Sequence, residues 1–223
     1  MQEQLSSLPL FQGMSRDDLA DVAKWAHLDT RLLKPARTIV RVGDICRSLI
    51  FVAEGRFQVT TSAMGHTYQI TETRHAPEVI EPERVFGLTQ QYSRTYTALT
   101  PTRIIELEKP DMLALIEKYL VFRLNLLALI STKAQKLHRN LWTPAPQTLD
   151  ENILHFVAKH CDIPAGSIEV KTKMTLLAHE LGVSRLDVSN ALHRLSDAGL
   201  IVLQRGIITI PDLQQALRYE PKA

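Results

Sequence analysis

The spacing of hydrophobic positions changes along the chain and predicts different structures in turn. Between residues 8 and 28, apolar side chains recur at helical intervals, which predicts an amphipathic helix. Ser15 is a suitable N-cap, because Asp17 and Asp18 follow it and place negative charge in the first turn. The N-terminal segment is therefore expected to be helical.

From residue 31 to residue 107, the period of the apolar positions becomes two, as in strands. Runs rich in β-branched and aromatic residues are separated by turn residues, such as those at 64–66. The predicted strands are residues 38–40, 49–52, 57–61, 67–71 and 103–107. Many short strands at this spacing predict an antiparallel barrel or roll.

Residues 110–142 predict a long helix, because they contain no glycine and no proline after Pro110. Their apolar stripe is wider than contact with one domain requires. We therefore expect the helix to pack on its own β-domain and on a partner subunit. The same pattern also fits two shorter helices with a break near residues 119–121. Residues 143–147, which include two prolines, predict a linker.

The composition is that of an ordinary globular protein. The 223 residues are 45% hydrophobic and 22% charged, which excludes collagen-like and globally disordered classes. The net charge of +2 is too small to indicate a partner. The chain has neither a secretion signal nor an apolar stretch long enough to span a membrane. A cytoplasmic protein without a membrane partner is expected.

Residues suited to redox, metal or catalytic chemistry are few. Cys46 and Cys161 are too few for a disulfide framework or for a four-thiolate iron–sulfur cluster. His155 and His160 are five residues apart, so they lie on different helix faces and predict no metal site. The sequence offers no nucleophile–base pair and no phosphate-cradling glycine loop, so it does not indicate an enzyme.

The segment from Met174 to Leu200 carries the strongest signal. Thr175 is a candidate cap for a short helix, which Gly182 ends in the manner of a left-handed C-cap. Ser184 then caps a second helix that continues to about Ala198. The buried face of this second helix is predicted to comprise Val188, Ala191, Leu192 and Leu195. A tight hairpin over residues 201–210 follows, and this order predicts a winged helix-turn-helix.

The outward residues of this motif suit double-stranded DNA. In the major groove, Arg185 can bond a guanine and Asn190 an adenine. Hydroxyl and ammonium groups at the helix starts can hold phosphates. The predicted DNA-binding residues are Lys173, Thr175, Ser184, Arg185, Asp187, Ser189, Asn190, Arg194 and Arg205. Leu186 fits either a thymine methyl group or the core. A helical hairpin with a solvated polar face is the alternative for the whole motif.

Motifs across most of the chain resemble the catabolite activator protein/FNR (CRP/FNR) family of bacterial transcription regulators. They are Pro9-Leu-Phe-x-x-Met-Ser, Gly43-Asp44, Leu49-x-Phe51-Val52-x-Glu54-Gly55-x-Phe57-x-Val59, Phe86-Gly87, Arg94-Thr95 and Leu181-Gly-Val-Ser-Arg185. The resemblance implies an α+β fold: an antiparallel β-roll of the cyclic-nucleotide-binding type over residues 1–109, a long dimerisation helix over 110–142, and a winged helix-turn-helix over 148–223. It also implies a homodimer that binds a palindromic operator.

The sequence departs from this family at the effector and reading positions. Members that bind cyclic nucleotides have a glutamate after the glycine of the effector segment, whereas Leu88 follows Gly87 here. Gly87, Arg94 and Thr95 are the effector-binding candidates, but cyclic AMP is not expected; Arg94 also fits a structural pairing with a roll carboxylate. The oxygen-sensing cysteine cluster is missing and no haem ligand pair is evident, so neither cofactor is predicted. Leu186 also replaces a glutamate common in the family.

The sequence thus predicts a homodimeric, sequence-specific transcription regulator with a small-molecule effector or none. RNA polymerase is a further partner if the protein activates transcription. The alternative is a protein-interaction or small-molecule sensor module whose winged domain does not bind DNA. The steep salt dependence of DNA binding distinguishes these two classes. The effector, the operator sequence, the target genes and the direction of regulation are not encoded in any pattern recognised in the sequence.

Overall fold

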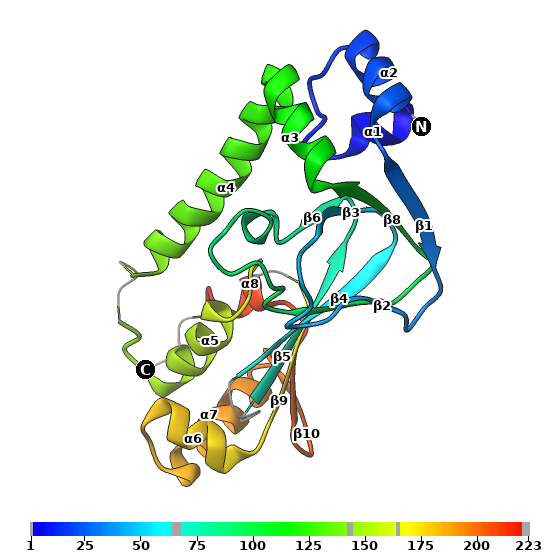
Figure 1. Ribbon diagram of the computed structural model, residues 1–223. Helices are drawn as coiled ribbons and strands as arrows, with labels where there is room; N and C mark the ends of the chain where they lie inside the picture. Colours follow the sequence, from blue (N-terminus) through cyan, green and yellow to red (C-terminus); the bar gives the residue numbers. More distant parts are fainter. Residues whose placement is uncertain (1, 64–67, 142–144, 164–165, 220–223) are drawn as a thin grey trace. The chain divides into compact units, whose positions relative to one another are not determined.

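Two structural units make up the chain in the computed structural model, which describes residues 2–63, 68–141, 145–163 and 166–219 (Figure 1). The roll unit comprises Met1–Gln58 and Arg74–Trp142, and the winged unit comprises Val59–Thr73 and Thr143–Ala223. The turn predicted at 64–66, the last residue of the predicted long helix and the first two linker residues lie outside the described residues. No described helix is both long enough and apolar enough to cross a bilayer.

Antiparallel strands form the body of the roll unit. One sheet has the order β1-β8-β3-β6, and β2 pairs with β7 in a second layer. The bounds are β1 Leu28–Leu33, β2 Thr38–Val40, β3 Ser48–Glu54, β6 Glu78–Ile80, β7 Thr95–Ala98 and β8 Thr102–Glu108. The predicted strands at 38–40, 49–52 and 103–107 are confirmed. The sequence did not predict β1, β6 or β7.

The helices that precede and follow the roll strands in the chain complete the core of the roll unit. They are α1 Gln2–Ser7, α2 Arg16–Trp25, α3 Lys109–Lys118 and α4 Leu120–Leu141, with the 3₁₀ turn Pro82–Arg84 between β6 and β7. Ser15 caps α2 as predicted, since its hydroxyl accepts the Asp18 N–H at 3.0 Å. The Phe11 ring lies 5.7 Å from that of Phe51 on β3 and 5.1 Å from that of Phe122 on α4. These contacts fix the start of α4 on the roll.

The long helix predicted over 110–142 is interrupted. Tyr119 has extended backbone angles (φ −115°, ψ 107°), which separate α3 from α4. Its hydroxyl donates a hydrogen bond to Asp21 on α2 at 2.6 Å, and Lys118 reaches the same carboxylate at 2.5 Å. The prediction of one continuous helix is therefore wrong and the alternative of a break near 119–121 is confirmed. Tyr119 is itself buried at this break (6% exposed).

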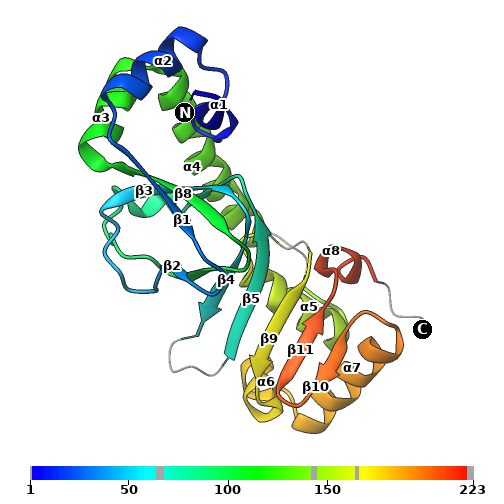
Figure 2. The ribbon, with the colours of Figure 1, turned by 90° about the vertical axis from the view of Figure 1, so that its right-hand side faces the viewer.

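The winged unit consists of helices packed on a small antiparallel sheet of order β10-β11-β9-β5 (Figure 2). Its elements are β4 Arg56–Ser62, which begins in the roll unit, β5 Tyr68–His75, α5 Leu149–Lys159, β9 Ile168–Thr172, α6 Met174–Leu181, α7 Arg185–Asp197, β10 Val202–Gln204, β11 Ile207–Ile210 and α8 Leu213–Ala216. The predicted order of helix, turn, helix and hairpin is confirmed. The predicted buried face of α7 is also confirmed: Val188, Ala191, Leu192 and Leu195 are all buried.

Strand β5 corresponds to the strand predicted at 67–71, but the sequence assigned it to the roll, whereas most of it belongs to the winged unit. It pairs with β9 from Tyr68↔Thr172 to Glu72↔Ile168. Ile70 on this strand is completely buried in the core of the winged unit. The predicted boundary, which assigned all of residues 1–109 to the roll, therefore differs from the observed division. Strand pairing between residues about 100 positions apart leaves no local signal in the sequence.

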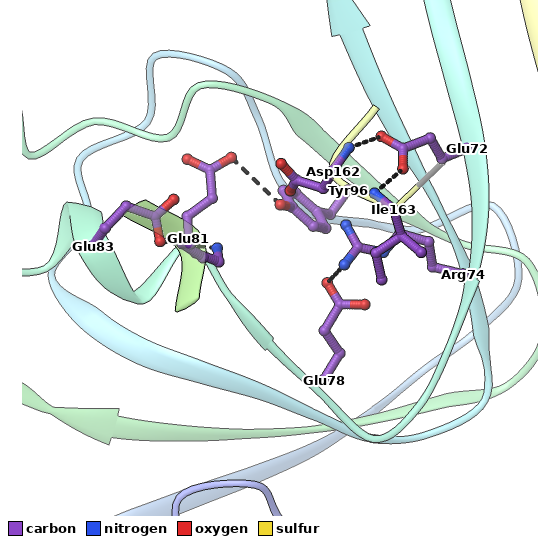
Figure 3. A network of polar contacts seen from close by, with 9 residues as sticks. Glu72, Arg74, Glu78, Glu81, Glu83, Tyr96, Asp162 and Ile163 are labelled. Atoms are coloured by element: carbon purple, nitrogen blue, oxygen red, sulfur yellow. Dashed lines mark hydrogen bonds and ion pairs between the residues drawn. The ribbon is translucent and has the colours of Figure 1, made fainter. Parts of the chain in front are cut away.

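Polar and aromatic contacts also join β5 to α5 and to the turn that follows it. The Tyr68 hydroxyl lies 2.7 Å from His160 Nε2, and the Tyr68 ring contacts that of Phe156 edge-on at 5.0 Å. The buried Glu72 carboxylate accepts the backbone N–H groups of Asp162 at 3.2 Å and Ile163 at 3.3 Å (Figure 3). These bonds satisfy a carboxylate that is only 1% exposed.

Candidate nucleic-acid interface

The turn between α6 and α7 has the local geometry that the sequence predicts. Gly182 adopts a left-handed conformation (φ 68°), and the N–H of Val183 bonds the Ala178 carbonyl at 3.0 Å. The Ser184 hydroxyl accepts the Asp187 N–H at 3.1 Å and donates to the Asp187 carboxylate at 2.7 Å. The first turn of α7 is therefore fixed by its own capping box. Asp187, predicted to bind DNA, acts in this cap.

The outer face of α7 is formed by side chains that do not pack into the core of the winged unit. Arg185 and Asn190 are exposed and Ser189 is half-buried. Leu186 is 69% exposed, so the interpretation of Leu186 as a core residue is wrong. Within the described residues, Arg185 has no side-chain partner, which leaves its guanidinium group available to a ligand.

A cavity of about 420 Å³ opens beside this face within the winged unit. Its floor is apolar and includes Leu177, Leu192 and Ile208. The polar residues that line it are Thr172, Lys173, Thr175, Arg185, Gln204 and Arg205. The structure therefore brings together four of the predicted DNA-binding residues: Lys173, Thr175, Arg185 and Arg205. Three of these four side chains are cationic, which suits an anionic partner such as a phosphodiester backbone.

The N-cap of α6 differs from the prediction. Lys173, rather than Thr175, occupies the cap position with extended backbone angles, and it has no side-chain capping bond. Thr175 instead lies exposed in the first turn of the helix. Because its hydroxyl is not needed for capping, it is free to contact solvent or a ligand. The predicted cap lies two residues too late, because lysine is not among the residues that favour an N-cap position.

Arg194 lies in an ion pair. Its Nε donates to Asp150 Oδ2 on α5 at 3.0 Å, and its Nη2 donates to the second carboxylate oxygen. Asp150 is only 3% exposed, so the guanidinium group neutralises a buried charge. No pattern in the sequence indicates this pair, because the helix dipole already explains an aspartate in the first turn of α5. Arg194 thus has a structural partner within the winged unit.

The three effector candidates, Gly87, Arg94 and Thr95, each lie close to other residues of the roll unit. A side chain on Gly87 would come within 2.8 Å of the Glu83 carbonyl oxygen, so only glycine fits there. The Thr95 hydroxyl accepts the N–H of Val42 at 3.1 Å. Burial raises the pKa of Glu81, and Arg94 lies close enough for its positive charge to oppose this rise. The structure therefore associates Arg94 with a roll carboxylate that the sequence did not single out.

Glu81 is a buried carboxylate at the start of the effector segment. It is 2% exposed and accepts the Ser93 N–H at 2.8 Å. It also accepts the Tyr96 hydroxyl at 3.4 Å (Figure 3). The Arg84 Nε lies 3.7 Å from it. Burial raises the pKa of Glu81, and the Ser93 hydrogen bonds and Arg94 oppose this rise. A lone glutamate between Ile80 and Pro82 carries no periodic signal, so sequence reasoning missed it.

Both units match known protein families. The cyclic nucleotide-binding domain matches residues 30–119, and the Crp-like helix-turn-helix domain matches residues 152–218. The cyclic AMP receptor protein of Thermus thermophilus is 23% identical over 207 residues, which are 91% of this chain and 92% of that protein.

Solved structures share the fold. The crystal structure of the Thermus thermophilus catabolite activator protein matches with a TM-score of 0.52 and 22% identity, over 94% of this chain and 98% of that one. The sensor domain of the regulator DNR from Pseudomonas aeruginosa matches with a TM-score of 0.51 and 20% identity, over 66% and 95%. Together with the two domain matches, these likenesses agree with the α+β fold and with the winged motif. The chain belongs to the CRP/FNR family of helix-turn-helix transcription regulators.

Proposed function

We propose that this chain acts as a homodimer that binds a palindromic DNA operator, with α7 of each subunit in the major groove. The observation that carries the proposal is the exposed, capped start of α7 beside a cavity whose lining includes Lys173, Arg185 and Arg205. Arg185 there has no partner among the described residues, and Asn190 lies on the same side of the helix as Leu186. Lys173 and Arg205, which line the same cavity as Arg185, then hold phosphates beside the reading helix.

The proposed dimer forms along α4. Phe122 and Leu126 of this helix are buried in the roll unit, but a second apolar stripe remains exposed. Its members are Leu120 (57% exposed), Leu124 (53%), Leu127 (54%) and Ile130 (37%). Spacings of four and three residues align such side chains on one face, as in helix pairs. Two equal α4 helices give the twofold symmetry that a palindromic operator requires.

We infer further that the effector of the roll unit, if one is used, is not a cyclic nucleotide. Leu88 stands where the members that bind cyclic nucleotides have a glutamate, so that carboxylate is missing from the effector segment. The Thr95 hydroxyl is occupied by Val42. A protein that binds its operator without any added ligand is the simplest behaviour consistent with these contacts. RNA polymerase is a further partner if the protein activates transcription.

The test is a selection of random duplex DNA on the purified protein without ligand, followed by binding measurements across salt concentrations. We expect a palindrome with half-sites about one helical turn apart. The logarithm of the affinity should fall with the logarithm of the salt concentration by about 0.9 per phosphate contact. Failure to enrich any duplex, even at low salt, would contradict the proposal and would favour a protein partner for the winged unit.

Arg185→Ala isolates the reading role of the exposed guanidinium group. A bidentate bond to guanine discriminates by about 1–3 kcal/mol, so the variant should lose roughly tenfold or more in preference for its base pair at each half-site. Arg16→Ala, at an exposed position on α2, is the matched control and should bind as the unaltered protein does. Unchanged specificity of the Arg185 variant would remove Arg185 from the reading residues.

A further inference from the structure

Leu186 occupies a well-defined position on the reading helix. It is the second residue of α7, directly after Arg185 and within the turn that the Ser184–Asp187 capping box fixes. N-terminal residues of a recognition helix are those that reach base edges. Ser189 and Asn190 follow it by three and four residues, so they share its side of the helix.

The exposure of Leu186 is not explained by packing. The side chain is 69% exposed, whereas the core of the winged unit takes Val188, Ala191 and Leu192 from the same helix. Its neighbours on the exposed side are polar, so Leu186 interrupts a face otherwise able to form hydrogen bonds. An apolar residue at this place leaves one apolar feature of the major groove to contact, the C5-methyl group of thymine.

We propose that Leu186 is a specificity-determining residue that selects a 5-methylpyrimidine in each half-site of the operator. Contact with the methyl group removes apolar surface of both partners from water. A cytosine at the same step presents an amino group, and a purine presents acceptors, which an apolar side chain would desolvate without a hydrogen bond. This inference rests on the proposed function, since it needs α7 in the major groove.

The test replaces each thymine of the selected operator in turn by deoxyuridine, which removes only the methyl group. Loss of one buried methyl group corresponds to about fourfold weaker binding per half-site. One symmetric pair of positions should show this loss, and about fifteenfold when both half-sites are changed, if the two half-sites contribute independently. If cytosine is placed at the same step, 5-methylation should strengthen binding by a similar factor.

Leu186→Ala should abolish the difference between thymine and deoxyuridine at that step, to within about twofold. Val202→Ala is the matched control, because Val202 is also exposed (49%) in the winged unit but lies on β10, and it should keep the difference. An operator bound equally with thymine or deoxyuridine at every step overturns this inference alone. Discrimination that survives in Leu186→Ala also overturns it, whereas failure to enrich any operator overturns the proposed function as well.

Discussion

The ion pair between Arg194 and Asp150 indicates that Arg194 stabilises the winged unit, whereas Arg185 on the same helix is proposed to read a base. Asp150 is buried, so Arg194→Ala would leave its charge without a counterion. Since the Arg194 side chain is itself 57% exposed, we expect a moderate loss of about 2 kcal/mol in the unfolding free energy of the winged unit. Denaturant unfolding of the variant measures this loss.

The double variant Asp150→Asn with Arg194→Ala provides the control. Removal of the buried charge should recover most of the stability lost in the single variant, because the remaining amide group is less costly to bury. If Arg194 instead read a base, Arg194→Ala would lose operator specificity at unchanged stability, and the second substitution would restore nothing. Arg185→Ala, which breaks no pair within the described chain, should leave stability unaltered.

At the same scale, the sequence predicted residues whose role is local. Gly182 and Ser184 were identified correctly because a left-handed cap and a capping box depend on neighbours within a few positions. Asp150 and Glu81 were missed because the donors that bond them, Arg194 and Ser93, are 44 and 12 residues away and become their neighbours only in the fold. Buried carboxylates are therefore the features of this chain least accessible to sequence reasoning.

At the scale of elements, strand β5 pairs with β9 and contributes to the core of the winged unit. We expect Ile70→Ala to cost about 2–4 kcal/mol, since Ile70 is completely buried in the core of the winged unit. Hydrogen exchange of the α7 amides should report this loss, because their protection depends on the same core. The change should be smaller at β3 and β8 of the roll unit.

Ile104→Ala on β8 is the matched control for this prediction. Ile104 is equally buried but belongs to the roll unit, so its loss should lower protection at β3 and spare α7. The opposite pattern for Ile70→Ala, with the roll weakened and α7 unaffected, would favour the boundary that the sequence predicted. Loss of protection at α7 would assign β5 to the winged unit, and loss of protection in the roll would assign it to the roll unit.

Elements with a clear local pattern in the sequence were predicted, whereas features that depend on contacts between distant segments were not. Strands β3 and β8 and helix α7 have seven or more residues and a clear buried face. The sequence left open whether residues 110–142 form one helix or two with a break near 119–121. Tyr119, which lies at the observed break, bonds Asp21, nearly 100 residues earlier in the chain, and such a contact leaves no local pattern. The pairing of β5 with β9 likewise depends on a contact between distant segments.

At the scale of the whole molecule, the exposed stripe of α4 predicts the assembly. A helix that keeps Leu120, Leu124 and Leu127 more than half exposed leaves a contiguous apolar surface in water, which is unfavourable for an isolated chain. Pairing two such stripes buries them and also joins two reading helices. The increase in operator affinity that results from joining two half-site contacts is commonly a hundredfold to ten-thousandfold.

We therefore expect the double variant Leu124→Glu with Leu127→Glu to be a folded monomer, because like charges would face each other across the paired helices. Light scattering should give the 25.2 kDa of one chain, and twice that mass for the unaltered protein. Operator affinity should fall at least about a hundredfold, while a single half-site is bound as before. Leu113→Glu, on the exposed side of α3, carries the same kind of change outside the stripe and should remain dimeric. A double variant that still has twice the chain mass would place the dimer contact elsewhere than on α4.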